Sequence, residues 1–185
     1  MQATNTWLEE YNMIKAVLAG DKQQYLELVR RYQKPVFGLH CRITNSKAQA
    51  EELTCHTFVK AYHNLRKFNF SCKFENWVYV MGLYLALDFM KAKGNMDEPA
   101  DSMYFVPEEN RAQFWQKAGQ RLMLRKAIAQ LGRKQQAILY LKYFEDLAYE
   151  EISEKLGRPE NKVKAIVYKT RKHLKNKLSA WGYFS

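Results

Sequence analysis

The residues with the clearest chemical use lie between positions 60 and 77, where cations and aromatic rings are mixed within eighteen residues. Cations bind phosphates and aromatic rings stack on unpaired bases, so this mixture is typical of a surface that holds single-stranded nucleic acid. The candidates are Lys60, Tyr62, Arg66, Lys67, Phe70, Lys73 and Trp77, followed by Tyr84, Lys91 and Lys93. The alternative is that the rings form a core and the lysines are solvated, and the stripe positions of Phe58, Phe74 and Trp77 favour a core role for those three.

A second basic region covers residues 158–178, with eight Lys or Arg and one acid, Glu160. A short periodic stretch before it ends at Leu156-Gly157, and the glycine suits a left-handed helix C-cap. Pro159 then stands near the start of the next helix, which is the layout of a helix-turn-helix. Such a helix, with cations around an apolar stripe, fits the major groove of duplex DNA between flanking phosphates.

The sequence gives little support for catalysis or for metal binding. The chain has no glycine-rich phosphate loop, nucleophile elbow or paired-acid motif. Six of the histidines and cysteines are candidates for a metal site or a redox switch, but their spacings match no zinc signature and cysteine is commonly buried as a small apolar residue; they are His40-Cys41, Cys55-His56, His63 and Cys72. We therefore expect a protein that is not an enzyme, with no catalytic residue, metal or cofactor.

The chain is basic, and its charge is distributed unevenly along its length. The 185 residues carry 30 Lys and Arg against 19 Asp and Glu, a net charge of +11. Residues 1–93 have a net charge of +5 and residues 119–185 one of +9, whereas residues 94–118 have −3 and hold two of the four prolines. Opposite charges on this linker and its flanks would hold the free chain compact by screened attraction.

The same composition predicts the compartment. No run approaches the ~18 apolar residues that cross a bilayer, and the N-terminus does not have the pattern of a signal peptide. Three cysteines are too few for a disulfide framework and suit a reducing environment. We expect a cytoplasmic, nucleoid-associated protein with no membrane partner.

Every periodic stretch in residues 1–93 has helical spacing. Asp21 is a candidate N-cap, and Pro35 predicts a kink or break in the helix that follows. Ser46 and Gln49 fit a capping box that opens a second helix. A short aromatic loop over residues 68–74 leads into a third helix through Trp77.

Residues 119–185 hold two more helical stripes, through Leu124-Ile128-Leu131 and from Ala137 to Phe144, before the helix-turn-helix. No convincing strand alternation is present, so we predict an all-α fold of two small helical domains joined by a flexible acidic linker. The predicted segments are a first domain over 8–93, a linker over 94–118, a second domain over 119–178 and an aromatic tail over 179–185. The tail would fold back on the second domain or contact a partner.

Together the motifs resemble the extracytoplasmic-function sigma factors of the sigma-70 family, over roughly residues 11–178. The first conserved domain of that family is matched by Gly20-Asp21 with Leu28-Val-Arg-Arg-Tyr-Gln33, Ala50-Glu-Glu-Leu-Thr54 with Phe58-Val-Lys-Ala-Tyr62, Phe74-x-x-Trp77 and Ala86-Leu-Asp88. The second is matched by Leu139-Tyr-Leu-Lys-Tyr-Phe-Glu145, Tyr149-Glu-Glu-Ile152, Leu156-Gly157 and Val163-Lys164. Both modules in the right order are a stronger signal than a helix-turn-helix alone.

The resemblance implies roles for named residues. In this family the first domain binds bacterial core RNA polymerase and melts the −10 promoter element, and the second reads the −35 element as duplex. The implied core polymerase-binding residues are Gln49, Glu51, Glu52, Cys55, His56 and Val59, a helix in which two acids usual for the family are missing. The melted −10 DNA would contact the cations and rings from Lys60 to Lys93 named above. The duplex −35 DNA would contact Lys162, Lys164, Ala165, Tyr168, Lys169, Arg171 and Lys172.

Some promoter-reading positions depart from the family pattern. An arginine and an asparagine expected near the melted strand are replaced by Val80 and Tyr84, and Gly82 adds helix flexibility worth ~1 kcal/mol relative to alanine. In the recognition helix, Ala165 and Ile166 replace the usual serine and arginine, and each lost bidentate contact is worth ~1–3 kcal/mol of discrimination.

These departures leave two interpretations of promoter targeting. One is ordinary divergence with an altered promoter preference. The other is weak autonomous promoter reading, compensated by a recruiting partner such as a DNA-binding activator or an RNA-guided effector. An anti-sigma factor is a further candidate partner. The rival function is a stand-alone helix-turn-helix regulator, or a sigma-like adaptor that does not itself initiate transcription.

Overall fold

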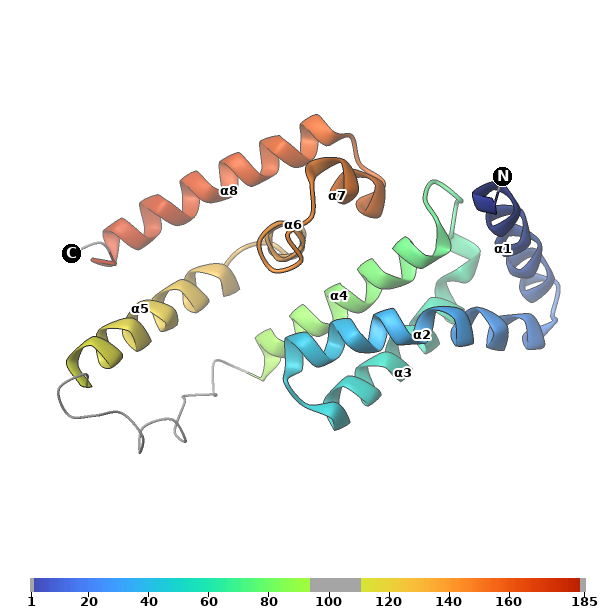
Figure 1. Ribbon diagram of the computed structural model, residues 1–185, viewed down its shortest axis with the longest axis horizontal. Helices are drawn as coiled ribbons and strands as arrows, with labels where there is room; N and C mark the ends of the chain where they lie inside the picture. The colour runs from blue at the N-terminus through green and yellow to red at the C-terminus, as the bar shows by residue number, and fades with distance from the viewer. Residues whose placement is uncertain (1, 94–110, 184–185) are drawn as a thin grey trace.

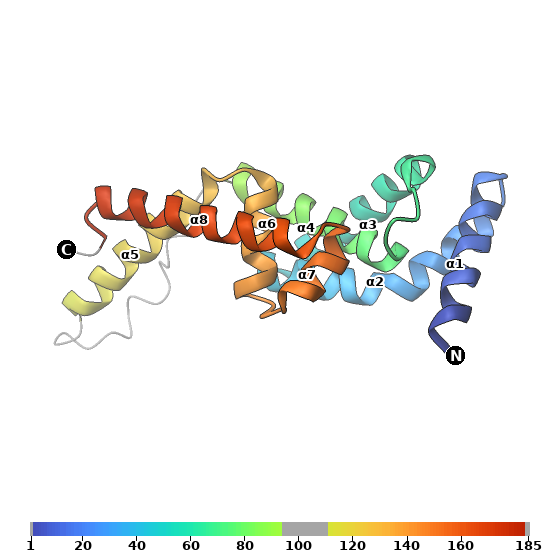
Figure 2. The ribbon, with the colours of Figure 1, turned by 90° about the horizontal axis from the view of Figure 1, so that it is seen from above.

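The computed structural model describes residues 2–93 and 111–183, and every regular element among them is a helix. The first group of helices is α1 (Gln2–Leu18), α2 (Lys22–Thr44), α3 (Lys47–Asn64), the 3-10 turn η1 (Leu65–Lys67) and α4 (Phe74–Ala92). The second group is α5 (Arg111–Ala129), α6 (Arg133–Tyr143), α7 (Tyr149–Leu156) and α8 (Glu160–Ala180). In Figure 1, α2, α3 and α4 lie together with α1 at the start of α2, and Figure 2 shows the same groups from above; α6 and α7 both contact α4. The all-α fold with two helical groups is confirmed.

Several helix ends are the ones that the sequence predicts. The Asp21 side chain accepts a hydrogen bond from the Gln23 N–H at 3.0 Å and caps α2. Gly157 ends α7 with φ +58°, the left-handed conformation that a residue without Cβ adopts most easily. Pro159 directly precedes α8, so it costs that helix no backbone donor.

Two local predictions differ from the structure. Of the kink or break predicted at Pro35, the break is wrong, because α2 continues from Lys22 to Thr44; the kink stays a prediction. An internal proline costs a helix about 3 kcal/mol, and the packing of α2 on α1, α3 and α4 offsets that cost. The capping box of α3 is only half formed: Ser46 Oγ accepts from the Gln49 N–H at 3.5 Å, but the buried Gln49 Oε1 has no partner.

The first core cluster lies inside the first group of helices. Its largest fully buried side chain is Phe74, and Phe58 is 5% exposed, as their stripe positions predict. Trp77 is partly buried against the same cluster. This core joins α1, α2, α3 and α4, and it fixes the positions of the loop and helix faces described below.

The second core cluster is shared between the two groups of helices. It combines Leu39, Tyr79 and Leu83 from α2 and α4 with buried residues of the second group; these are Ala137, Ile138, Leu141, Ile152, Val163 and Val167. The two groups of helices are held together here by the burial of apolar side chains, which are removed from water.

The predicted attraction between the acidic linker and its basic flanks concerns residues 94–118, most of which lie outside the described residues.

The domain boundaries stay a prediction. Helix α5 begins at Arg111, within the range assigned to the linker, and α1 begins before position 8. Within residues 2–93 and 111–183, no helix is both long enough and apolar enough to cross a membrane.

Candidate polymerase and nucleic-acid interface

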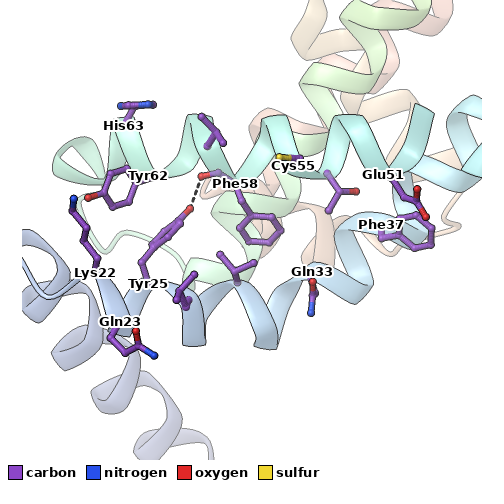
Figure 3. Close-up of a pocket in the computed structure, with 14 residues that line it drawn as sticks. Lys22, Gln23, Tyr25, Gln33, Phe37, Glu51, Cys55, Phe58, Tyr62 and His63 are labelled. Atoms are coloured by element: carbon purple, nitrogen blue, oxygen red, sulfur yellow. Dashed lines mark hydrogen bonds between the residues drawn. The ribbon is translucent and has the colours of Figure 1, made fainter. Parts of the chain in front are cut away.

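A groove of about 760 Å³ runs between α2 and α3 (Figure 3). Its apolar lining includes Leu26, Val29 and Phe37 of α2 and Phe58, Val59 and Tyr62 of α3. Leu26 is 48% exposed and Val59 50%, so apolar side chains also form its rim. An apolar groove between two helices can accept the apolar face of a third helix.

One end of the groove is held by a buried hydrogen bond. The Tyr25 hydroxyl donates to the Phe58 carbonyl oxygen at 2.5 Å and so ties α2 to α3 (Figure 3). Burial raises the pKa of Tyr25, which keeps this hydroxyl protonated and able to donate. The Tyr25 ring also packs edge-on against Tyr62, with ring centroids 5.0 Å apart. The groove therefore has a fixed shape at this end.

The six residues implied for polymerase binding divide between two places on α3. Glu51, Cys55 and Val59 line the groove. Glu52 and His56 are exposed but outside its lining, and Gln49 is half-buried. Sequence reasoning missed exposed Leu26 and half-buried Phe37 of α2, because apolar residues at the edge of a helix look like ordinary surface until a second helix makes them the wall of a groove.

The loop between η1 and α4 is held by a cluster of aromatic rings packed at tilted angles. Phe70 has φ +58°, an uncommon conformation for a residue with a side chain. Its ring centroid is 4.8 Å from that of Phe68 and 4.9 Å from that of Tyr11 on α1. Phe68 in turn contacts Trp77 at 5.2 Å. The loop that would capture a melted base therefore has a defined conformation rather than an open one.

The other candidates for melted DNA occupy different surfaces. Tyr62 lines the α2–α3 groove rather than the loop. Lys60, Arg66, Lys67 and Lys91 are exposed, and Lys93 is half-buried at the end of α4.

Two of the candidates for melted DNA, one on α4 and one at its N-cap, contact the second group of helices as well as solvent. The Lys73 ammonium lies 3.1 Å from a Glu154 carboxylate oxygen, and this partner raises the pKa of Lys73. Tyr84 is partly buried, and the Arg133 guanidinium stands 5.8 Å from its ring centroid. The structure thus does not bring the ten melted-DNA candidates together on one free surface.

Helix α8 presents its candidate residues on one face. Val163, Val167 and Thr170 are buried, and Ile166 is half-buried against the same core. All the residues implied for duplex DNA are exposed: Lys162, Lys164, Ala165, Tyr168, Lys169, Arg171 and Lys172. Tyr168 is 70% exposed, so it stands among the cations rather than in the core. A face of this kind can bind phosphates and reach base edges.

The histidines and cysteines form no metal site in the part of the chain that the structure describes. No group of three or more His, Cys, Asp or Glu is close enough to hold an ion there. His40 is instead a core residue, because its Nε2 is 3.2 Å from the Gly82 carbonyl oxygen and its Nδ1 is 2.9 Å from Thr54 Oγ1. Burial lowers the pKa of His40, so the ring is neutral and Nε2–H donates to the carbonyl.

Comparisons with known proteins identify the two groups of helices. Residues 28–95 match the family model of sigma-70 region 2, and residues 121–174 match that of sigma-70 region 4. The chain is 26% identical over 179 residues to the RNA polymerase sigma-H factor of Pseudomonas aeruginosa, covering 88% of this chain and 90% of that protein. It is 25% identical over 178 residues to the ECF RNA polymerase sigma factor SigW of Bacillus subtilis, covering 89% of this chain and 94% of that one. The chain belongs to the extracytoplasmic-function group of the sigma-70 family.

Two solved structures also align with this one over most of their length. CnrH in complex with the cytosolic domain of CnrY is 17% identical, with 93% of this chain and 98% of that chain covered and a TM-score of 0.47. RpoE in complex with the anti-sigma factor NepR from Bartonella quintana is 15% identical, with 85% and 98% covered and a TM-score of 0.44. Sigma-70 factors direct transcription initiation by RNA polymerase, and this sigma factor contains both of the regions matched above.

Proposed function

We propose that this sigma factor binds core RNA polymerase through the α2–α3 groove, holds melted −10 DNA with the residue 67–73 loop and α4, and places α8 on duplex −35 DNA. It acts as a factor rather than an enzyme, in the cytoplasm at the nucleoid. An anti-sigma factor that competes for these surfaces is part of the proposal.

The observation that carries the proposal is the groove. Val59, on the apolar rim of the groove, lies on the α3 segment that the family resemblance assigns to polymerase binding. Leu26 forms the facing part of the rim on α2. Apolar side chains about half exposed on both walls cost free energy in water unless a partner covers them. The cationic face of α8 supports the duplex DNA role independently.

The test is core polymerase binding by charged rim variants. Leu26→Asp and Val59→Asp place a carboxylate where an apolar partner would bury it, so each is expected to weaken core binding by at least about tenfold, or about 1.4 kcal/mol. Leu18→Asp is the matched control, since Leu18 is 37% exposed on α1 and outside the groove. Equal binding by all three variants and the unmodified chain would remove the groove from the polymerase interface.

A second candidate function is that of a sigma-like adaptor with a recruiting partner. It is favoured by Ala165, which exposes a methyl group where the family usually has a hydroxyl, and by Ile166, which is half-buried and offers no guanidinium to DNA. In vitro initiation with the cognate core polymerase separates the two candidates. Stable core binding without open-complex formation, even with a targeting partner present, favours the adaptor.

A further inference from the structure

Helix α1 carries a line of side chains that ends at the residue 67–73 loop, to which the proposed function gives melted DNA. Trp7, Tyr11 and Lys15 are spaced four residues apart, so they lie on one face of the helix. The ring centroids of Trp7 and Tyr11 are 5.9 Å apart, with the ring planes 20° from parallel. The Tyr11 ring also contacts Phe70 in the loop, which lies beside α1 in Figure 1. Helix α1 therefore continues the aromatic cluster of the loop onto a second element.

The ring at the outer end of this line has surface left for a ligand. Trp7 is 45% exposed and lies outside the first core cluster. Tyr11 is half-buried and contacts a ring on each side, so it supports the loop. Among the described residues, Tyr11 is the one aromatic partner of Trp7. The remaining surface of the indole is free to stack on another planar group.

The two acids near these rings are engaged by residues of α2. The Glu9 carboxylate is 3.3 Å from the Arg31 guanidinium. The buried Glu10 carboxylate accepts a hydrogen bond from the Tyr32 hydroxyl. On the line itself, the exposed Lys15 ammonium is 5.4 Å from the centroid of the middle ring. A phosphate chain that approaches this face therefore meets a cation, while the neighbouring carboxylates already have partners.

We propose that Trp7 is a second base-stacking position, and that α1 extends the path of melted DNA beyond the residue 67–73 loop. The ligand is single-stranded DNA, because aromatic rings next to cations stack bases and hold phosphates, and because this face is continuous with the loop. The strand leaves the loop along α1 with its phosphates near Lys15, and an unpaired base stacks on Trp7. The proposal rests on the proposed function of the loop. Trp7 precedes residues 28–95, so this position lies outside the segment that matches the region 2 family model.

Photo-crosslinking tests whether a base reaches Trp7. Oligothymidine in which iododeoxyuridine replaces some thymidines is bound to the complex of the full chain with core polymerase and irradiated. Crosslinked peptides are then identified by mass spectrometry. A crosslink at Trp7 is expected, because an iodinated pyrimidine reacts with an aromatic ring on which it stacks. Tyr143, which is 54% exposed at the end of α6 and is assigned to no DNA surface, is the internal reference and is expected to stay unmodified.

Substitutions of Trp7 measure what its ring contributes. Fluorescence anisotropy of labelled oligothymidine gives the Kd of the complex with core polymerase. Trp7→Ala is expected to weaken binding by at least about fivefold, the lower end of the effect of removing one stacking ring. Trp7→Phe keeps a ring and is expected to retain most of the affinity. Trp7→Leu keeps apolar bulk without a ring and is expected to bind as weakly as Trp7→Ala.

Leu8→Ala is the matched control for these variants. Leu8 is 51% exposed at the next position of α1 and does not lie on the line of rings. Its substitution is expected to leave oligothymidine binding unchanged. All of these positions are outside the α2–α3 groove, so core polymerase binding is expected to be equal for every variant.

Three results would overturn the stacking role of Trp7. They are equal oligothymidine binding by Trp7→Ala and the unmodified chain, full affinity in Trp7→Leu, which would indicate an apolar contact, and a Trp7 crosslink that is absent or no stronger than that of Tyr143. The double variant Lys67→Ala, Lys73→Ala tests the loop separately. If it binds oligothymidine like the unmodified chain, the proposed function of the loop fails, and the extension along α1 fails with it.

Discussion

Replacing Gly82 by alanine is expected to destabilise this sigma factor, although the same change usually stabilises a helix. Gly82 lies in the interior of α4, where glycine costs about 0.5–1 kcal/mol relative to alanine. A Cβ at this position, however, would stand 3.1 Å from His40 Nε2 and 3.3 Å from Val36 Cγ1, both closer than ordinary van der Waals contact.

The neighbours of Gly82 have little room to move. His40 is fully buried and is held from both ring nitrogens, by the Gly82 carbonyl oxygen and by Thr54. Val36 is 1% exposed in the first core cluster. Forcing an extra carbon into a packed core costs ~1–3 kcal/mol, so after the helix gain the expected net change is a loss of up to ~2.5 kcal/mol of unfolding free energy.

The measurement is urea and thermal unfolding followed by far-ultraviolet circular dichroism. For a chain of this length, 1 kcal/mol corresponds to a Tm shift of ~2–4 °C. Gly119→Ala is the matched control, because Gly119 lies in the interior of α5 and a Cβ there meets nothing within 4 Å. That control is expected to gain stability. A Gly82→Ala variant that also gains stability would show that His40 and Val36 can move to make room for the added methyl group, and would refute the expectation.

Three further outcomes follow from single side chains. Burial lowers the pKa of His40, so the unfolded chain binds a proton on this residue at a higher pH than the folded chain does. Below about pH 6.5 the unfolding free energy of the unmodified protein is therefore expected to fall by up to ~1.4 kcal/mol per pH unit more than that of a His40→Asn variant. Urea unfolding at a series of pH values measures the difference. Thr170→Val is expected to stabilise by ~1 kcal/mol because the buried Thr170 hydroxyl has no partner, whereas Thr57→Val is expected to destabilise, since the Thr57 hydroxyl donates to the Leu53 carbonyl oxygen at 2.8 Å. Lys169→Ala is expected to reduce the salt dependence of duplex DNA binding by about one unit of slope, and equal slopes for this variant and the unmodified chain would remove Lys169 from the phosphate contacts.

Local sequence signals predicted the helices well because their causes are local. The Asp21 cap and the Gly157 end depend on a few adjacent residues, and both are present in the structure. The exposed basic face of α8 likewise follows from helical periodicity. By contrast, the continuation of α2 through Pro35 depends on packing against three other helices, which no window of sequence contains.

The contacts between the two groups of helices could not be predicted from the sequence, because they too depend on segments that are distant in the chain. Lys73 and Glu154 are far apart in the chain, and each alone is an ordinary surface charge. Tyr79 has the spacing of a core residue, but nothing in the sequence says that its core includes Ile138 and Ile152. Gly82 was predicted only to loosen α4, whereas its missing side chain makes room for His40.

The φ of +58° at Phe70 has a practical consequence for engineering sigma factors. This backbone conformation is costly for a bulky residue, and it is maintained partly by the ring of Tyr11, which lies before the residues that match the region 2 family model. Transplanting residues 67–73 alone into a relative would therefore lose the support of α1, and the grafted segment would relax. A chimera that keeps the shape of this segment has to carry the N-terminal helix with it.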